Sequence, residues 1–169
     1  AGKQVRTVVD AASGLLTQAL PYRPFLIKPN RQELAQIFDA PMEEDAQILA
    51  AARQLQRMGA RNVLVSLAEA GALLLEERGT VHRMACPKGR VRNSVGAGDS
   101  MVAGFLAGLY GADICCEDNM KMDESTMQVS GLHTYRYEHA LKLGTAAGGA
   151  TAFADGLAKK EEIEQLFRT

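Results

Sequence analysis

The sequence predicts an α/β fold built around a mainly parallel sheet. Short apolar or β-branched runs alternate along the chain with segments of helical periodicity. The run Val63–Ser66 is apolar until its last residue, which is typical of a strand buried on both faces of a parallel sheet. A glycine-containing turn, Gly96–Asp99, stands directly before a helical segment. Because ligands of such folds bind at the carboxyl ends of the strands, this turn marks the expected site.

Composition narrows the class of protein. The chain has 169 residues, of which 47% are hydrophobic and 23% charged, enough for one α/β domain over residues 1–169 with a substantial core. A net charge of −1 argues against nucleic-acid partners and against a cationic membrane-binding face. Cys86, Cys115 and Cys116 match neither a metal-ligand spacing nor a disulfide framework, so reduced thiols in a cytoplasmic protein are expected.

The first part of the chain is expected to hold short elements and one long helix. Short strands are expected at Val5–Val9 and Phe25–Ile27, and short helices at Leu15–Leu20 and Arg31–Phe38. Asn30 and Glu33 have the spacing of a capping box at the start of the last of these. A longer amphipathic helix is expected to begin at Pro41 and to end at Gly59.

The second part is predicted to continue the sheet and then to become helical. Val63–Ser66 should be followed by a meander of two strands, Ala72–Glu76 and Val81–Ala85. Residues 113–131 are interpreted as a surface insertion. The further helices are expected at Tyr135–Ala154, which is rich in small residues, and at Lys160–Phe167. Small residues favour either tight helix packing or the close approach of a flat ligand.

The turn at Gly96–Asp99 carries the clearest chemical pattern. Gly96 and Gly98 can adopt positive φ, and a helix start presents N–H donors and the positive end of its dipole to a phosphate group. Asp99 would repel that phosphate unless the carboxylate has a role, such as accepting the proton of an attacking hydroxyl. The pattern therefore indicates phosphoryl transfer. The alternative is that Ser94 or Asp99 simply caps the helix.

The segment Val95–Gly104, with its Gly-Ala-Gly-Asp core, resembles the signature of the ribokinase (PfkB) family of sugar kinases. The resemblance implies a ribokinase-like three-layer α/β/α fold with a mainly parallel sheet. It also implies that Gly96, Ala97 and Gly98 form the anion hole and that Asp99 is the catalytic base.

Two further segments match elements of this family. Asn30–Glu33 resembles its N-x-x-E element, which implies that Glu33 and Asn30 hold Mg²⁺ largely through water. Lys28 resembles a lysine of the sugar-phosphate branch and is expected near the nucleotide phosphates.

Ser66–Ala72 matches a segment usually written S-L-G-x-x-G-A, in which Ser66 and Gly71 would follow the bound ATP. Ala68 stands where a glycine is usual. The small-residue helix corresponds to the adenine side, which implies nucleotide contacts at Ala147 and Thr151.

The segments Lys28–Asn30 and Asn93–Val95 are most similar to the branch containing bacterial 1-phosphofructokinases and tagatose-6-phosphate kinases. The implied reaction is ATP- and Mg²⁺-dependent conversion of fructose 1-phosphate to fructose 1,6-bisphosphate. Phosphorylation of tagatose 6-phosphate or another sugar, and a non-catalytic nucleotide-binding module, are the alternatives. The aspartate that helps ribokinase bind a monovalent cation is absent near Asn93, which argues against a potassium requirement.

The resemblance spans nearly the whole chain but corresponds to the C-terminal half of the family's usual length. The N-terminal half, with most sugar contacts and the lid, has no counterpart in the sequence. The chain alone is therefore expected to bind MgATP weakly and to turn over poorly, and a homodimer of the full-length protein is one expected assembly.

Overall fold

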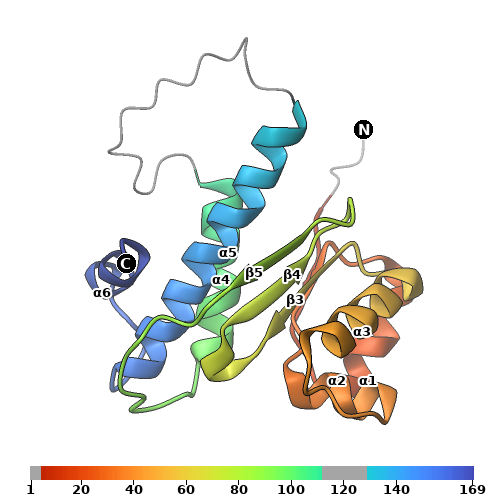
Figure 1. The fold of residues 1–169 in the computed structure, drawn as a ribbon, viewed down its shortest axis with the longest axis horizontal. Helices are drawn as coiled ribbons and strands as arrows, with labels where there is room; N and C mark the ends of the chain where they lie inside the picture. The colour runs from red at the N-terminus through yellow and green to blue at the C-terminus, as the bar shows by residue number, and fades with distance from the viewer. Residues whose placement is uncertain (1–4, 112–128) are drawn as a thin grey trace. The chain divides into compact units, whose positions relative to one another are not determined.

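A computed structural model describes residues 5–111 and 129–169 of the chain (Figure 1). Its contacts divide the chain into two compact units, Ala1–Arg83 and Met84–Thr169. No helix in the described ranges has the length and apolar character that crossing a membrane requires.

The first unit is organised around a sheet with the strand order β1-β2-β3-β4-β5. The strands are β1 (Val8–Val9), β2 (Leu26–Ile27), β3 (Asn62–Ser66), β4 (Ala72–Leu75) and β5 (Val81–Met84). β1, β2 and β3 run parallel, whereas β3 and β4 are antiparallel, with Val63 opposite Leu75. The mixed α/β class and the antiparallel return of β4 are thereby confirmed. The first strand is shorter than expected, since only Val8 and Val9 pair.

Three helices belong to this unit: α1 (Ser13–Ala19), α2 (Arg31–Phe38) and α3 (Asp45–Met58). α3 packs against β3 and β4 (Figure 1). The predicted start of this helix at Pro41 is wrong. Glu44 and Gln47 form a capping box, in which the Gln47 side chain accepts the N–H of Glu44 at 3.0 Å. That cap fixes the helix start four positions later.

The core of the first unit joins the apolar faces of these helices to the sheet. The periodicity of α3 predicts one apolar face made of Ile48, Ala51, Ala52, Leu55 and Met58. The first four are buried, whereas Met58, the last residue of the helix, is 42% exposed, so the prediction is wrong there. Val63 and Val65 of β3 lie in the same cluster with Leu73 and Leu75 of β4. The intervening Leu64 is also fully buried, which confirms the prediction of an inaccessible β3.

The second unit contains the helices α4 (Ala97–Tyr110), α5 (Val129–Phe153) and α6 (Lys160–Phe167). α4 and α5 run side by side at a distance that only small residues allow (Figure 1). A Cβ on Gly104 would lie 2.7 Å from the Cβ of Ala147, and one on Gly108 would lie 2.8 Å from the Cα of Ala140. Tight packing therefore accounts for much of the small-residue pattern.

The start of α5 differs from the expected Tyr135, because the helix begins at Val129. The predicted insertion, residues 113–131, thus loses its last three residues to α5, and its remainder lies outside the described residues.

α6 is held to α5 by aromatic contacts. The rings of His139 and Phe167 meet edge to face with centroids 5.2 Å apart, and Lys142 Nζ lies 4.9 Å from the Phe167 ring centre. Burial, and secondarily the charge of Lys142, lower the pKa of His139.

Candidate functional site

The turn that opens α4 has the backbone expected of a phosphate-binding turn at one of its two glycines. Gly96 is the N-cap residue, with φ +80° and ψ −6°, a left-handed conformation that favours glycine. A Cβ at this position would also lie 2.9 Å from Leu157 Cδ2. The expectation of positive φ at Gly98 is wrong, because Gly98 already lies within α4 and its φ is not positive. Its backbone conformation is open to any L-residue.

Hydrogen bonds fix the shape of this turn. The Asn93 side-chain oxygen accepts the N–H of Val95 at 3.0 Å, and Ser94 O accepts the N–H of Ala97 at 3.2 Å. The N–H groups of Gly98 and Asp99 meet no acceptor among the residues that the structure describes. These donors at the helix start are thus available to an anion.

The Asp99 carboxylate is exposed and joins no hydrogen bond or ion pair with a described residue. α4 has no side-chain cap: neither Ser94 nor Asp99 bonds to the N–H groups of its first turn. The capping alternative is therefore wrong. The Asp99 carboxylate therefore has no hydrogen-bond partner among the described residues and lies in the first turn of α4, where a phosphate would bind. This arrangement is expected of a catalytic base.

The turn is anchored to the end of α5. The N–H groups of Arg92 and Asn93 both donate to Ala152 O, at 2.8 and 3.2 Å. Thr151 Oγ1 donates to Ser100 Oγ at 2.8 Å and accepts the N–H of Ala158 at 3.2 Å. Asn93 and Ser100 are thus positioning residues that the sequence pattern did not predict. For Asn93 a signal existed, since asparagine often binds the backbone N–H two residues ahead in a turn.

The two predicted adenine-side residues lie in α5 within this unit. Ala147 is 2% exposed and packs against Gly104 of α4. Thr151 is 1% exposed and uses its hydroxyl in the bonds to Ser100 and Ala158. These contacts give both residues a packing role, and their nucleotide contacts stay predictions.

The predicted magnesium-side residues form the capping box that the sequence indicated in the first unit. Asn30 Oδ1 accepts the N–H of Glu33 at 2.8 Å, and Glu33 Oε2 accepts the N–H of Asn30 at 2.7 Å. Glu33 Oε1 has no hydrogen-bond partner among the described residues, and Glu33 is half-buried. Over the described ranges no group of three or more His, Cys, Asp or Glu residues could hold a metal. A single rigid carboxylate suits Mg²⁺, which keeps most of its water and binds phosphate oxygens.

The same region brings Lys28 and Ser66 near this capping box. Asn30 forms a parallel β-bridge with Ser66, whose N–H donates to Pro29 O at 3.1 Å. Lys28 is 6% exposed, and its Nζ lies 3.2 Å from a carboxylate oxygen of Asp10. The structure thus assembles Lys28, Asn30, Glu33 and Ser66 at the carboxyl ends of β2 and β3. The proposed contact of Lys28 with phosphate stays a prediction.

The loop between β3 and β4 shows why a glycine is usual at position 68. Ala68 has φ +51° and Gly71 has φ +92°, so both residues adopt conformations that glycine favours. Leu67 N–H donates to Gly71 O at 2.8 Å, and Gly71 N–H donates to Ala68 O at 2.9 Å, which closes the loop. Ala68 therefore adopts a left-handed conformation at the cost of local strain.

Comparisons with known proteins agree with these motifs. The profile described as pfkB family carbohydrate kinase matches residues 1–163. A 1-phosphofructokinase from Bacillus subtilis (strain 168) is 35% identical over 97% of this chain and 46% of its own length. A D-tagatose-1-phosphate kinase from Bacillus licheniformis is 31% identical over 98% of this chain and 47% of its own length.

Solved structures place the fold in the same group. A Staphylococcus aureus crystal structure described as a phosphofructokinase superposes with a TM-score of 0.78 at 34% identity, over 97% of this chain and 46% of that one. The fold is therefore ribokinase-like. The chain spans about half the length of the curated relatives it matches.

Proposed function

Since the chain belongs to the pfkB family of carbohydrate kinases, we propose that it forms the nucleotide-binding and catalytic part of an ATP-dependent kinase of phosphorylated ketohexoses. The observation that carries this proposal is the start of α4. There the N–H groups of Gly98 and Asp99 and the Asp99 carboxylate all lack partners among the described residues. Donors and a base held together at one helix start suit phosphoryl transfer better than simple phosphate binding.

In the proposed reaction, Asp99 accepts the proton of a sugar hydroxyl. The hydroxyl oxygen forms a bond to the γ-phosphorus of ATP, while the bond between that phosphorus and the β–γ bridging oxygen breaks, leaving ADP. The N–H groups of Gly98 and Asp99 donate to the phosphate oxygens on which negative charge develops. The bonds of the turn to Ala152 and Ser100 keep these donors in place.

Glu33, positioned by its bonds with Asn30, would hold Mg²⁺ through water molecules. Bound there, the ion would neutralise phosphate charge and orient the phosphates. The rigid capping box supplies one defined carboxylate for this purpose.

The sugar phosphate of the proposal is fructose 1-phosphate, phosphorylated to fructose 1,6-bisphosphate. The support is the similarity of Lys28–Asn30 and Asn93–Val95 to that branch of the family, together with the relative named 1-phosphofructokinase. The relative named D-tagatose-1-phosphate kinase supports a tagatose phosphate as the second candidate. Since the chain spans about half of either relative, we propose that most sugar contacts come from a further segment and that the chain alone turns over poorly.

The test compares Asp99→Asn with Glu161→Gln, a neutralised acid in the first turn of α6. Both variants are assayed for MgATP binding by calorimetry. ADP release is then measured with fructose 1-phosphate and with tagatose phosphates, after the chain is joined to an N-terminal half taken from a relative. Asp99→Asn should keep MgATP binding and lose about 10²–10⁴-fold in turnover, whereas Glu161→Gln should keep both.

Retained turnover in a folded Asp99→Asn protein would remove the catalytic role of Asp99. MgATP binding without turnover on any sugar phosphate by the joined wild-type protein would instead favour the non-catalytic nucleotide-binding module.

A further inference from the structure

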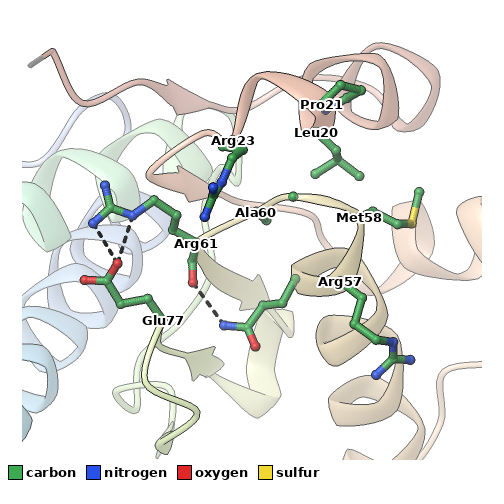
Figure 2. A pocket seen from close by; sticks show the side chains of 10 residues that line it. Leu20, Pro21, Arg23, Arg57, Met58, Ala60, Arg61 and Glu77 are labelled. Carbon is green, nitrogen blue, oxygen red and sulfur yellow. Dashed lines mark hydrogen bonds and ion pairs between the residues drawn. The ribbon is translucent and has the colours of Figure 1, made fainter.

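An open pocket of about 520 Å³ lies in the first unit (Figure 2). Its lining includes Leu20, Pro21, Arg23, Met58, Ala60 and Arg61, and we call it the arginine pocket. Arg23 precedes β2 and Arg61 precedes β3, so the pocket lies at the amino ends of these parallel strands. Asn30 and Ser66 follow the same strands at their carboxyl ends. The pocket and the proposed magnesium-side residues therefore occupy opposite edges of the sheet.

The charged residues of the pocket are predominantly basic. Its lining contains Arg23, Arg57, Arg61 and Glu77, a net charge of +2 from three cations and one anion, on a chain whose total is −1. Arg61 is paired with Glu77, whose Oε2 lies 2.8 Å from Nε and 2.7 Å from a terminal guanidinium nitrogen. Arg23 and Arg57 form no ion pair with any acid in the described ranges. The pocket thus contains uncompensated positive charge.

Arg23 is directed toward Arg61, as Figure 2 shows, whereas Arg57 points away from both. The backbone of Arg23 has φ +54°, a left-handed conformation that is unfavourable for residues other than glycine and asparagine. The N–H of Arg23 donates to Leu20 O at 2.9 Å, which holds this conformation. Strained residues of this kind are found preferentially at binding sites.

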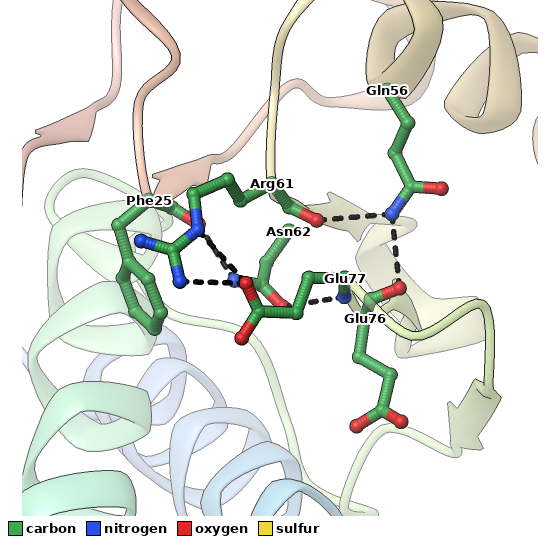
Figure 3. A network of polar contacts seen from close by, with 6 residues as sticks. All are labelled: Phe25, Gln56, Arg61, Asn62, Glu76 and Glu77. Carbon is green, nitrogen blue, oxygen red and sulfur yellow. Dashed lines mark hydrogen bonds and ion pairs between the residues drawn. The ribbon is translucent and has the colours of Figure 1, made fainter.

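A buried amide network fixes the backbone that carries Arg61 and Glu77 (Figure 3). Asn62 is fully buried, and its side chain donates to Phe25 O at 2.7 Å and accepts the N–H of Glu77 at 3.0 Å. Gln56 Nε2 donates to Arg61 O at 3.0 Å and to Glu76 O at 2.9 Å. Arg61 is further held over the Phe25 ring, 5.4 Å from its centre. One wall of the pocket is therefore preorganised.

We propose that the arginine pocket binds a small phosphorylated molecule with an apolar body. The guanidinium groups of Arg23 and Arg61 present parallel N–H donors that match phosphate oxygens. Pro21 and Met58, both exposed, supply apolar surface for the organic part, and the volume lies in the range of small-molecule sites. Glu77 competes with the phosphate for Arg61. This site goes beyond the proposed kinase function and does not depend on it.

The test uses the full 169-residue chain and two probes, inorganic phosphate and phenyl phosphate. Binding is followed by NMR through the backbone amide shifts of Arg23 and Ala60 for this pocket and of Gly98 and Asp99 for the proposed phosphate turn. Phenyl phosphate should shift the pocket amides at lower concentration than inorganic phosphate, because only phenyl phosphate covers the apolar wall.

Three variants separate the roles of the charges. Arg23→Gln should weaken phenyl phosphate binding at the pocket about tenfold, the effect of losing one charge-assisted hydrogen bond. Glu77→Gln should strengthen it, since the competing carboxylate is removed while its backbone bond to Asn62 stays. Arg53→Gln changes the charge equally at an exposed position of α3 outside the pocket and should have no effect.

Shifts confined to Gly98 and Asp99 would overturn the proposal, as would equal affinities for Arg23→Gln and Arg53→Gln. Weaker binding in Glu77→Gln would also contradict it. Shifts at Gly98 and Asp99 would support phosphate binding at the start of α4, whereas failure at the pocket leaves the kinase proposal intact, since its readouts are MgATP binding and the effect of Asp99→Asn.

Discussion

The two glycines at the start of α4, Gly96 and Gly98, should differ in how substitution by alanine changes the free energy of unfolding. Gly96→Ala places a side chain in a left-handed conformation, at a cost of about 1–2 kcal/mol in the free energy of unfolding. The new Cβ would also lie 2.9 Å from Leu157 Cδ2, the end of an exposed side chain that can move at little cost. Gly98→Ala introduces the same methyl group into a residue that already lies within the helix, so it adds no left-handed strain and should not lower the free energy of unfolding.

The assay is urea denaturation of both variants followed by circular dichroism, with calorimetric titration of MgATP on each. Gly96→Ala should unfold at lower urea than the wild type, and Gly98→Ala at the same or higher urea. The double variant Gly96→Ala/Leu157→Ala serves as the control for the contact, because it leaves only the backbone strain. Equal midpoints for the two single variants would refute the assignment of positive φ to Gly96 alone.

Three more predictions concern other residues. Glu33→Gln should raise the Mg²⁺ concentration needed for half-maximal turnover of the joined protein, since one charge near the hydrated ion is lost while the side-chain oxygen can still accept the N–H of Asn30; an unchanged Mg²⁺ dependence would leave Glu33 a structural role. Ala68→Gly should stabilise the protein by about 0.5–1 kcal/mol, because it relieves the left-handed conformation of an exposed residue; a lower urea midpoint would contradict this. The pKa of His139 is lowered below 6.5 in the folded protein. At pH values between the folded-state pKa and 6.5, the unfolded chain therefore binds more protons than the folded chain. The contribution of neutral His139 is therefore complete above pH 6.5 and is lost as pH falls through the folded-state pKa. The denaturation midpoint should decrease less between about pH 7.5 and pH 5 in His139→Gln than in the wild type, and equal decreases would exclude His139 as the source.

The sequence alone determined the features that depend on local chemistry. The capping box of Asn30 and Glu33 has both predicted bonds, since it closes within one helical turn. The buried face of α3 follows from its periodicity, and the Gly-Ala-Gly-Asp pattern identifies the family because its chemistry is contained in one short continuous segment. The sequence also showed that Ala68 stands where the family pattern has a glycine. A glycine in such a pattern indicates a left-handed backbone conformation, and Ala68 adopts one, with φ +51°.

Only the tertiary structure decided which residues lie beside one another, because these contacts join segments that are far apart in the sequence. The bond between Thr151 and Ser100, and the fit of Gly104 against Ala147, both depend on the packing of α4 on α5. The same packing gave the small residues of α5 a structural role, which composition could not separate from ligand contact. The start of α3 was misjudged because either Pro41 or Glu44 could open a helix, and the side chain of Gln47 selects Glu44.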